Sequence, residues 1–190
     1  CRSVPVRHLP HMFKILVLAL LLAPAAQADP MAAAATPGAV LLMRHATAPG
    51  TGDPADMRLG DCSTQRNLSD EGRAEARVIG QRLRSAGIAP DRILSSQWCR
   101  TTETAELLDL GPVTPFPAAN SFFSDRSTAK RQTAEVLAYL ADLPKGERVL
   151  IVTHQVNIAA LTGISPSSGE IVITRLAGGA LEVVDRLPPD

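Results

Sequence analysis

Three short, largely apolar runs stand out in the hydrophobic pattern of this chain. They are residues 39–43, 92–95 and 149–153. Runs of this length are typical of strands buried on both faces, as in a parallel sheet. The first run ends at Arg44 and His45. The second precedes Arg100, and the third ends at His154. Because ligands of open α/β sheets bind beyond the carboxyl ends of the strands, these side chains are predicted to meet at one sheet edge.

Apolar residues recur at helical spacing between these runs. The predicted helices are residues 70–86, 98–108, 129–143 and 155–162. Ser69 is the predicted N-cap of the first helix, and the acidic residues Asp70 and Glu71 favour a helix start at the same place.

Three more segments have the pattern of strands. Residues 113–116 are predicted to form a short strand, and residues 171–176 and 181–184 a closing hairpin. Strands that alternate with helices indicate an α/β fold. We therefore expect a three-layer αβα sandwich around a mixed, mostly parallel central sheet, with the hairpin as its antiparallel edge.

The N-terminal residues have the pattern of a secretory signal peptide. From Met12, where we expect the native start, a lysine precedes the apolar residues 15–23, and Ala26-Gln27-Ala28 forms a cleavage motif. A membrane-spanning helix needs about 20 apolar residues, and this run has about half that number. We therefore expect residues 1–28 to be removed and the protein to be periplasmic or secreted, with no membrane attachment afterwards.

The rest of the chain is expected to hold one domain. Residues 29–38 are rich in alanine and proline and are predicted to be a disordered linker, and residues 39–190 form the predicted domain. The 19 basic and 19 acidic residues balance, and no basic block is present, so a nucleic-acid partner is not indicated. No feature indicates an oligomeric state.

Only two histidines follow the predicted cleavage site. Two of the four histidines precede the predicted cleavage site, and the other two are His45 and His154. With Arg44 and Arg100 they would form an anion site, and phosphate is the anion we expect. Two histidines could also ligate zinc, but adjacent arginines repel a cation and catalytic zinc takes three protein ligands, so we predict no metal.

Several motifs resemble those of the histidine phosphatase superfamily, which includes the cofactor-dependent phosphoglycerate mutases. The resemblance spans residues 39–176. The matching motifs are Arg44-His45-Ala46, residues 67–76, residues 95–105 and Val152-Thr153-His154. The resemblance implies the family's fold and, for residues 39–190, a catalytic domain. It also implies that His45 attacks phosphorus and becomes phosphohistidine, while Arg44, Arg100 and His154 hold the phosphoryl oxygens, with no cofactor.

One element of the family pattern is missing. Many members carry a glutamate about twenty residues after the second arginine, as proton donor to the leaving group, but residues 118–121 contain no carboxylate. Another branch has aspartate directly after the second histidine, where this chain has Gln155. Asp125 and Asp53 are the nearest substitutes, and Asp125 is the candidate acid because of its place in the corresponding loop.

Residues 47–66 form a long predicted loop rich in glycine and proline. Loops of this length in compact domains are usually functional. We expect it to face the substrate and to supply Arg58 or Arg66 as a second anion contact; a solvated surface loop is the alternative. Cys62 in this loop and Cys99 are the only cysteines after residue 28, and in an oxidising compartment they are predicted to form a disulfide rather than two free thiols.

Together these features predict a phosphomonoester or phosphoramidate hydrolase of the histidine acid phosphatase type, acting on a small phosphorylated substrate through His45. A catalytically weak, phosphate-binding periplasmic protein of the same fold is the alternative. Hydrolysis is favoured over mutase chemistry because an exported protein has little access to glycolytic intermediates.

Overall fold

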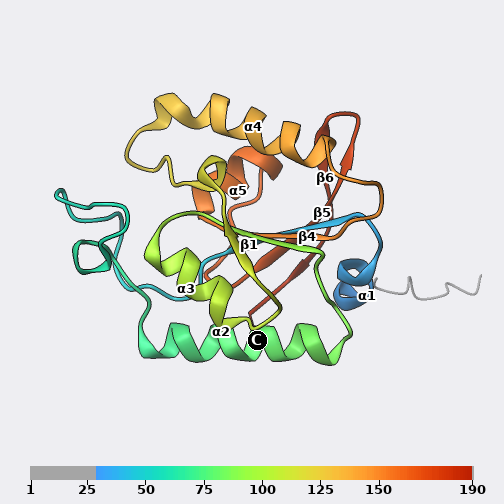
Figure 1. The fold of residues 1–190 in the computed structure, drawn as a ribbon, viewed down its shortest axis with the longest axis horizontal. Coiled ribbons are helices and arrows are strands. Elements are labelled where there is room, and N and C mark those ends of the chain that lie inside the picture. The colour runs from blue at the N-terminus through green and yellow to red at the C-terminus, as the bar shows by residue number, and fades with distance from the viewer. Residues whose placement is uncertain (1–28, 190) are drawn as a thin grey trace, which may run out of the picture.

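A computed structural model describes residues 29–189, which form a six-stranded sheet between two layers of helices (Figure 1). The strands are β1 Ala39–Arg44, β2 Arg92–Ser95, β3 Val113–Pro115, β4 Val149–Thr153, β5 Ile171–Ala177 and β6 Ala180–Leu187. The α-helices are α1 Pro30–Ala35, α2 Asp70–Ser85, α3 Cys99–Leu107, α4 Ala129–Ala141 and α5 Gln155–Thr162. Short 3-10 turns are η1 Cys62–Thr64, η2 Pro117–Ala119 and η3 Arg126–Thr128.

The sheet is mixed and mostly parallel, as predicted. Its strand order is β3-β2-β4-β1-β5-β6. The first four strands run parallel, β5 is antiparallel to β1, and the β5–β6 hairpin closes the sheet. Because β2, β4 and β1 are parallel neighbours, the residues that follow them emerge side by side at one edge.

The central strand β1 supplies both hydrophobic cores of the sandwich. Side chains alternate across a strand, so Leu41 and Met43 pack with residues of α1, α2 and α3, while Val40 and Leu42 pack with residues of α4 and α5. Figure 1 shows α2 and α3 on one side of the sheet and α4 and α5 on the other. The predicted three-layer sandwich is confirmed.

Helix α2 begins at the predicted cap and lies very close to its neighbours. The Ser69 hydroxyl accepts a hydrogen bond from the N–H of Gly72 at 3.1 Å. A Cβ atom at Gly72 would lie 2.1 Å from the carbonyl oxygen of Thr47, and one at Gly80 would lie 2.1 Å from that of Leu108. Glycine at these two positions lets α2 pack directly on the loop after β1 and on the end of α3.

Residues 29–38 are not a disordered linker. They contain α1, which is capped by Asp29 and has Pro30 in its first turn, where proline costs no hydrogen bond. Ala34 is completely buried, and α1 packs against β1, β5 and β6. The alanines that resembled a linker are strong helix formers with side chains small enough for close packing.

The predicted signal peptide, residues 12–28, and the residues before it lie outside the described part of the chain. Within residues 29–189, none of the helices combines the length and the hydropathy that crossing a membrane requires.

Candidate active site

The sheet topology brings the four predicted site residues to one cavity of about 120 Å³. Arg44 is the last residue of β1, and His45 follows it. His154 follows β4 and is the N-cap residue of α5. Arg100 lies in the first turn of α3, which follows β2. Arg66, from the loop before α2, also lines this cavity. The cavity thus joins three arginines and two histidines from four separate segments.

His45 is held as a neutral imidazole. The residue is 2% exposed, and Nδ1 lies 2.8 Å from the carbonyl oxygen of Ala46. A carbonyl only accepts, so Nδ1 carries the proton and Nε2 keeps a lone pair. Burial and the nearby arginines, opposed by the Ala46 hydrogen bond, lower the pKa of His45 from 6.5 to about 3. His45 is therefore available as a nucleophile through Nε2 at neutral pH.

His154 is oriented by partners on both ring nitrogens. Arg100 Nη2 lies 3.4 Å from Nδ1, and because a guanidinium only donates, Nδ1 must accept. Nε2 then donates to the Ser96 hydroxyl at 2.9 Å. Burial, followed by the charge of Arg100, lowers the pKa of His154 well below its ordinary value. The sequence analysis gave Ser96 no role. Its position directly after β2, at the edge where His154 also lies, is the feature that could have indicated a contact with this histidine.

The other two arginines that line the cavity, Arg44 and Arg66, are held in place by backbone carbonyl groups. Arg44 Nη1 donates to the carbonyl oxygen of Pro166 at 2.9 Å. Arg66 donates from Nε to Gly52 at 2.7 Å and from Nη1 to Ala48. Burial and the charge of Arg100 lower the pKa of both Arg44 and Arg66, but arginine stays charged in proteins. The cavity is therefore strongly electropositive and suited to an anion.

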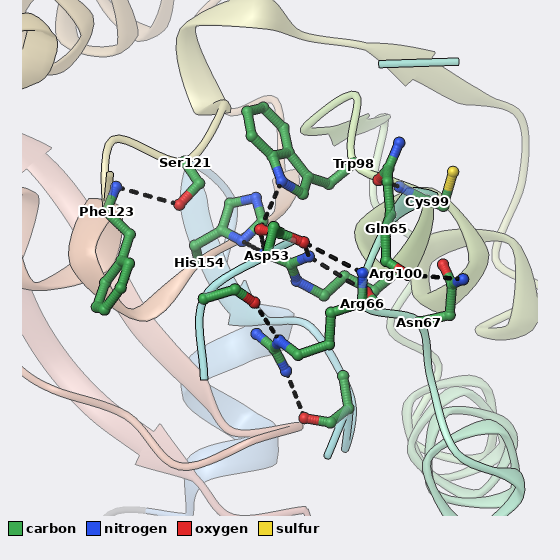
Figure 2. A network of polar contacts seen from close by, with 12 residues as sticks. Asp53, Gln65, Arg66, Asn67, Trp98, Cys99, Arg100, Ser121, Phe123 and His154 are labelled. Carbon is green, nitrogen blue, oxygen red and sulfur yellow. Dashed lines mark hydrogen bonds and ion pairs between the residues drawn. The ribbon is translucent and has the colours of Figure 1, made fainter. Parts of the chain in front are cut away.

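Asp53 is bound directly to Arg100 (Figure 2). Its Oδ1 accepts from Nη1 at 2.6 Å and its Oδ2 from Nη2 at 3.0 Å. The Trp98 indole N–H and the Arg66 backbone N–H donate to the same carboxylate at 3.1 and 3.3 Å. Burial alone would raise the pKa of Asp53, but these donors and the Arg100 charge outweigh it and the pKa is lowered. Asp53 is thus ionised in this state and holds no proton to donate.

The structure does not place Asp125 or Arg58 at the cavity. Asp125 is exposed and caps η3, where it accepts from the Ser127 backbone N–H at 3.0 Å. Hydrogen bonds from the Ser127 hydroxyl and N–H lower its pKa, so the structure does not support Asp125 as the acid. Arg58 is exposed and pairs with Asp61 at 3.0 Å, which turns its side chain to the surface. Of the two arginines proposed in this loop, only Arg66 lines the site.

Cys62 and Cys99 are joined in a disulfide, with Cα atoms 5.7 Å apart. Cys99 begins α3 immediately before Arg100, and its backbone N–H donates to the Gln65 side chain at 2.9 Å. The bridge therefore ties the second half of the 47–66 loop to the helix that carries Arg100.

This disulfide gives the first testable prediction. With Cys1 changed to Ser, the unfolded, unreduced protein should show no titratable thiol, and reduction should lower the free energy of unfolding by about 2–4 kcal/mol. Two thiols titrating without reductant would rule the bridge out.

The two buried histidines predict how stability depends on pH. Both have a pKa below the ordinary 6.5 in the folded protein. The unfolded chain then binds more protons, so stability is lost as pH falls from 6.5 towards about 3, the pKa of His45. Thermal unfolding in a phosphate-free buffer should show a smaller acid-induced loss for His45→Asn than for the unsubstituted protein. Equal losses would contradict the lowered pKa of His45.

Within residues 29–189, no group of three or more His, Cys, Asp and Glu side chains is placed to hold a metal ion.

Part of the chain is similar in sequence to known phosphatases. The family model described as histidine phosphatase superfamily (branch 1) matches residues 40–120. The mitochondrial serine/threonine-protein phosphatase Pgam5 of Drosophila virilis is 36% identical over 69 residues, which cover 36% of this chain and 21% of that protein. The chain thus spans about a fifth of the curated relatives it matches.

Solved structures share the fold. The protein histidine phosphatase SixA complexed with tungstate superposes with a TM-score of 0.57 at 20% identity, covering 80% of this chain and 97% of that chain. A phosphoserine phosphatase from Entamoeba histolytica in complex with phosphoserine gives a TM-score of 0.55 at 13% identity, covering 78% of this chain and 95% of that chain.

Proposed function

Because the chain belongs to the histidine phosphatase superfamily, we propose that it is a phosphohydrolase of the histidine acid phosphatase type that forms phosphohistidine on His45. One observation carries the proposal: a buried, neutral histidine with Nε2 as its nucleophilic atom lines a small cavity together with three arginines. The low pKa of His45 also supports activity in acid, because the imidazole stays unprotonated there.

In the first step, the Nε2 lone pair of His45 attacks phosphorus and the bond from phosphorus to the leaving group breaks. Arg44, Arg66 and Arg100 stabilise the negative charge on the phosphoryl oxygens during transfer. The Nδ1–H bond to Ala46 fixes the ring and spreads the positive charge that forms on it. In the second step, water attacks phosphorus, the N–P bond breaks, and inorganic phosphate leaves a neutral His45.

The leaving group is the second part of the proposal. Asp53 is the one carboxylate among the described residues that line the cavity, and it is ionised while it is paired with Arg100. We therefore propose substrates whose leaving groups need little protonation, namely aryl phosphates or phosphoramidates. The activity named for the SixA structure, removal of phosphate from protein histidine, belongs to the second class.

A neighbouring cavity provides room for a leaving group that carries a ring. It measures about 480 Å³ and shares Phe123, Gln155 and Val156 with the phosphoryl cavity. It is lined further by the apolar residues Phe122, Ala129, Ala159 and Ala160 and by the polar residues Arg126 and Ser165. A cavity of this size and composition is typical of small-molecule sites, and its position provides room for a ring attached to the phosphoryl group.

The absence of a protonated acid predicts a steep dependence on the leaving group. The turnover rate should fall as the leaving-group pKa rises, because a positioned acid, worth about 10²–10⁴-fold, is missing. Asp125→Asn should leave turnover of aryl and alkyl phosphates unchanged. A selective loss of alkyl substrates in Asp125→Asn would show that Asp125 reaches the leaving group after all.

A substrate panel tests the proposed function. Release of phosphate is measured from an aryl phosphate, a phosphoramidate, an alkyl phosphate and a phosphodiester, all with EDTA present. We expect release from the first two. A protein that binds phosphate but releases none from any of these four substrates would favour the anion-binding alternative. This alternative is worth testing because Asp53 already pairs with Arg100. Activity that EDTA abolishes and one metal restores would contradict a metal-free reaction.

We also propose that the protein is exported. The disulfide supports this, since such bonds persist in oxidising compartments. Cell fractionation should recover the protein outside the cytoplasm, with residues 1–28 removed.

A further inference from the structure

Every terminal N–H of Arg100 is already engaged within the protein. The guanidinium has five N–H groups, four of them on Nη1 and Nη2. Nη1 donates to Asp53 and to the carbonyl oxygen of Arg66, at 2.6 and 3.2 Å. Nη2 donates to Asp53 at 3.0 Å and lies 3.4 Å from His154. Nε is buried and has no hydrogen-bond partner among residues 29–189. A phosphoryl group therefore finds no terminal donor of Arg100 until one of these partners leaves.

Asp53 is the partner that resembles a substrate. A carboxylate presents two oxygens to the two Nη atoms of arginine, and a phosphoryl group presents two oxygens to them in the same way. We propose that Asp53 is an internal ligand of the phosphoryl site, which the substrate displaces from Arg100, and that this exchange sets the affinity of the site for phosphate. The inference rests on the proposed function only in naming phosphate as the anion.

Charge explains why the free protein would hold an internal ligand. The Arg100 side chain is 3% exposed and that of Asp53 is 13% exposed. A guanidinium so deeply buried is costly without a counterion. Asp53 supplies that counterion while the site lacks substrate. A phosphate dianion brings more negative charge than the carboxylate and also meets Arg44 and Arg66, so it can take the place of Asp53.

Two glycines precede Asp53 in its loop, and a disulfide anchors the part of the loop that follows. Gly50 and Gly52, just before Asp53, have φ of +89° and +72°, in the region that glycine adopts most easily. The later part is tied to α3 by the Cys62–Cys99 disulfide and by Gln65. Rotation near the two glycines can move Asp53 away from Arg100 and leave the bridge intact, at the cost of the hydrogen bond from Arg66 Nε to the Gly52 carbonyl.

A different role for Asp53 makes the opposite prediction. If Asp53 only holds Arg100 in position, its removal lets the guanidinium move and weakens phosphate binding. If it competes with phosphate, its removal strengthens binding. The apparent dissociation constant equals the intrinsic one divided by the fraction of protein that is able to bind. If the state with Asp53 displaced is a minor state, populated at about 0.1–10%, competition predicts at least a tenfold gain in affinity when Asp53 is removed.

The test measures orthophosphate binding by calorimetry, which needs no turnover. Asp53→Asn keeps the size of the side chain and removes the charge; Asp53→Ala is a second variant in case the amide still bonds Arg100. Asp56→Asn, an exposed aspartate in the same loop, is the matched control. We expect orthophosphate to bind about tenfold or more tightly to both Asp53 variants and unchanged to the control. The orthophosphate-induced rise in unfolding temperature should increase in parallel, which also checks folding.

Weaker or unchanged orthophosphate binding in both Asp53 variants would overturn the inference. The gain in orthophosphate affinity must also depend on Arg100. In an Arg100→Ala background, Asp53→Asn should therefore give no gain in affinity. A full gain in that background would also overturn the inference. Failure of the proposed function is distinct. A protein that binds orthophosphate as expected but hydrolyses no substrate refutes the hydrolase and leaves the exchange at Asp53 standing.

Discussion

The change of His45 to Asn should reduce phosphate release by about 10⁴-fold or more, the scale seen when a nucleophile that works as part of a unit is removed. The asparagine side chain places an N–H near the position of Nδ1, so it can still donate to Ala46. It has no lone pair in place of Nε2, so no covalent intermediate can form. Steady-state turnover of an aryl phosphate measures the effect.

Orthophosphate binding shows whether the cavity of the His45→Asn variant is still intact. Because the arginines that hold the oxygens are untouched, orthophosphate affinity should be largely kept while turnover is lost. A variant that retains most of its turnover would show that another residue attacks phosphorus. Loss of binding and turnover together would show only that the cavity has collapsed, which the unfolding temperature would reveal.

The change of Arg100 to Ala should lower turnover by about 10²–10³-fold, the typical cost of removing one donor that stabilises transition-state charge. Arg100 is buried, lies beside His154, lines the same cavity as His45 and approaches the site from the start of α3. Arg100→Lys keeps the charge but not the planar fork that binds two oxygens, so we expect an intermediate loss.

The control for Arg100 is Arg77→Ala, which removes an exposed arginine of α2 and should leave turnover unchanged. Arg100→Ala also leaves the Asp53 carboxylate without its counterion, so a lower unfolding temperature is expected. Full turnover in Arg100→Ala would mean that Arg44 and Arg66 suffice to hold the phosphoryl group.

The sequence was most informative where local pattern and topology coincide. Apolar runs predicted β1, β2 and β4 because strands buried on both faces need uninterrupted apolar residues. Arg44 ends such a strand, and His45 and His154 directly follow one, so their meeting at one edge could be deduced from the order of the elements. Arg100 required the family motif as well, because an arginine in the first turn of a helix commonly faces solvent.

Contacts made through irregular loops could not be deduced in this way. The pairing of Asp53 with Arg100 joins residues 47 positions apart through a loop whose path no periodicity describes. The same reason explains why Asp125 was expected to be the proton donor. Its position in the loop resembles that of the family's acid, but its carboxylate caps η3. Helix α1 was missed because its alanine-rich sequence fits a linker as well as a helix, and only packing against the sheet decides between them.

Trapping the phosphoenzyme tests the central claim most directly. Radiolabelled substrate is mixed with the protein and quenched within the first turnover, and the label is located by peptide mapping. A phosphohistidine on His45 predicts a label that is lost in acid, survives alkali, maps to the peptide containing His45 and is absent from His45→Asn. A label that survives acid and maps to a serine or threonine would contradict the assignment of His45 as the nucleophile.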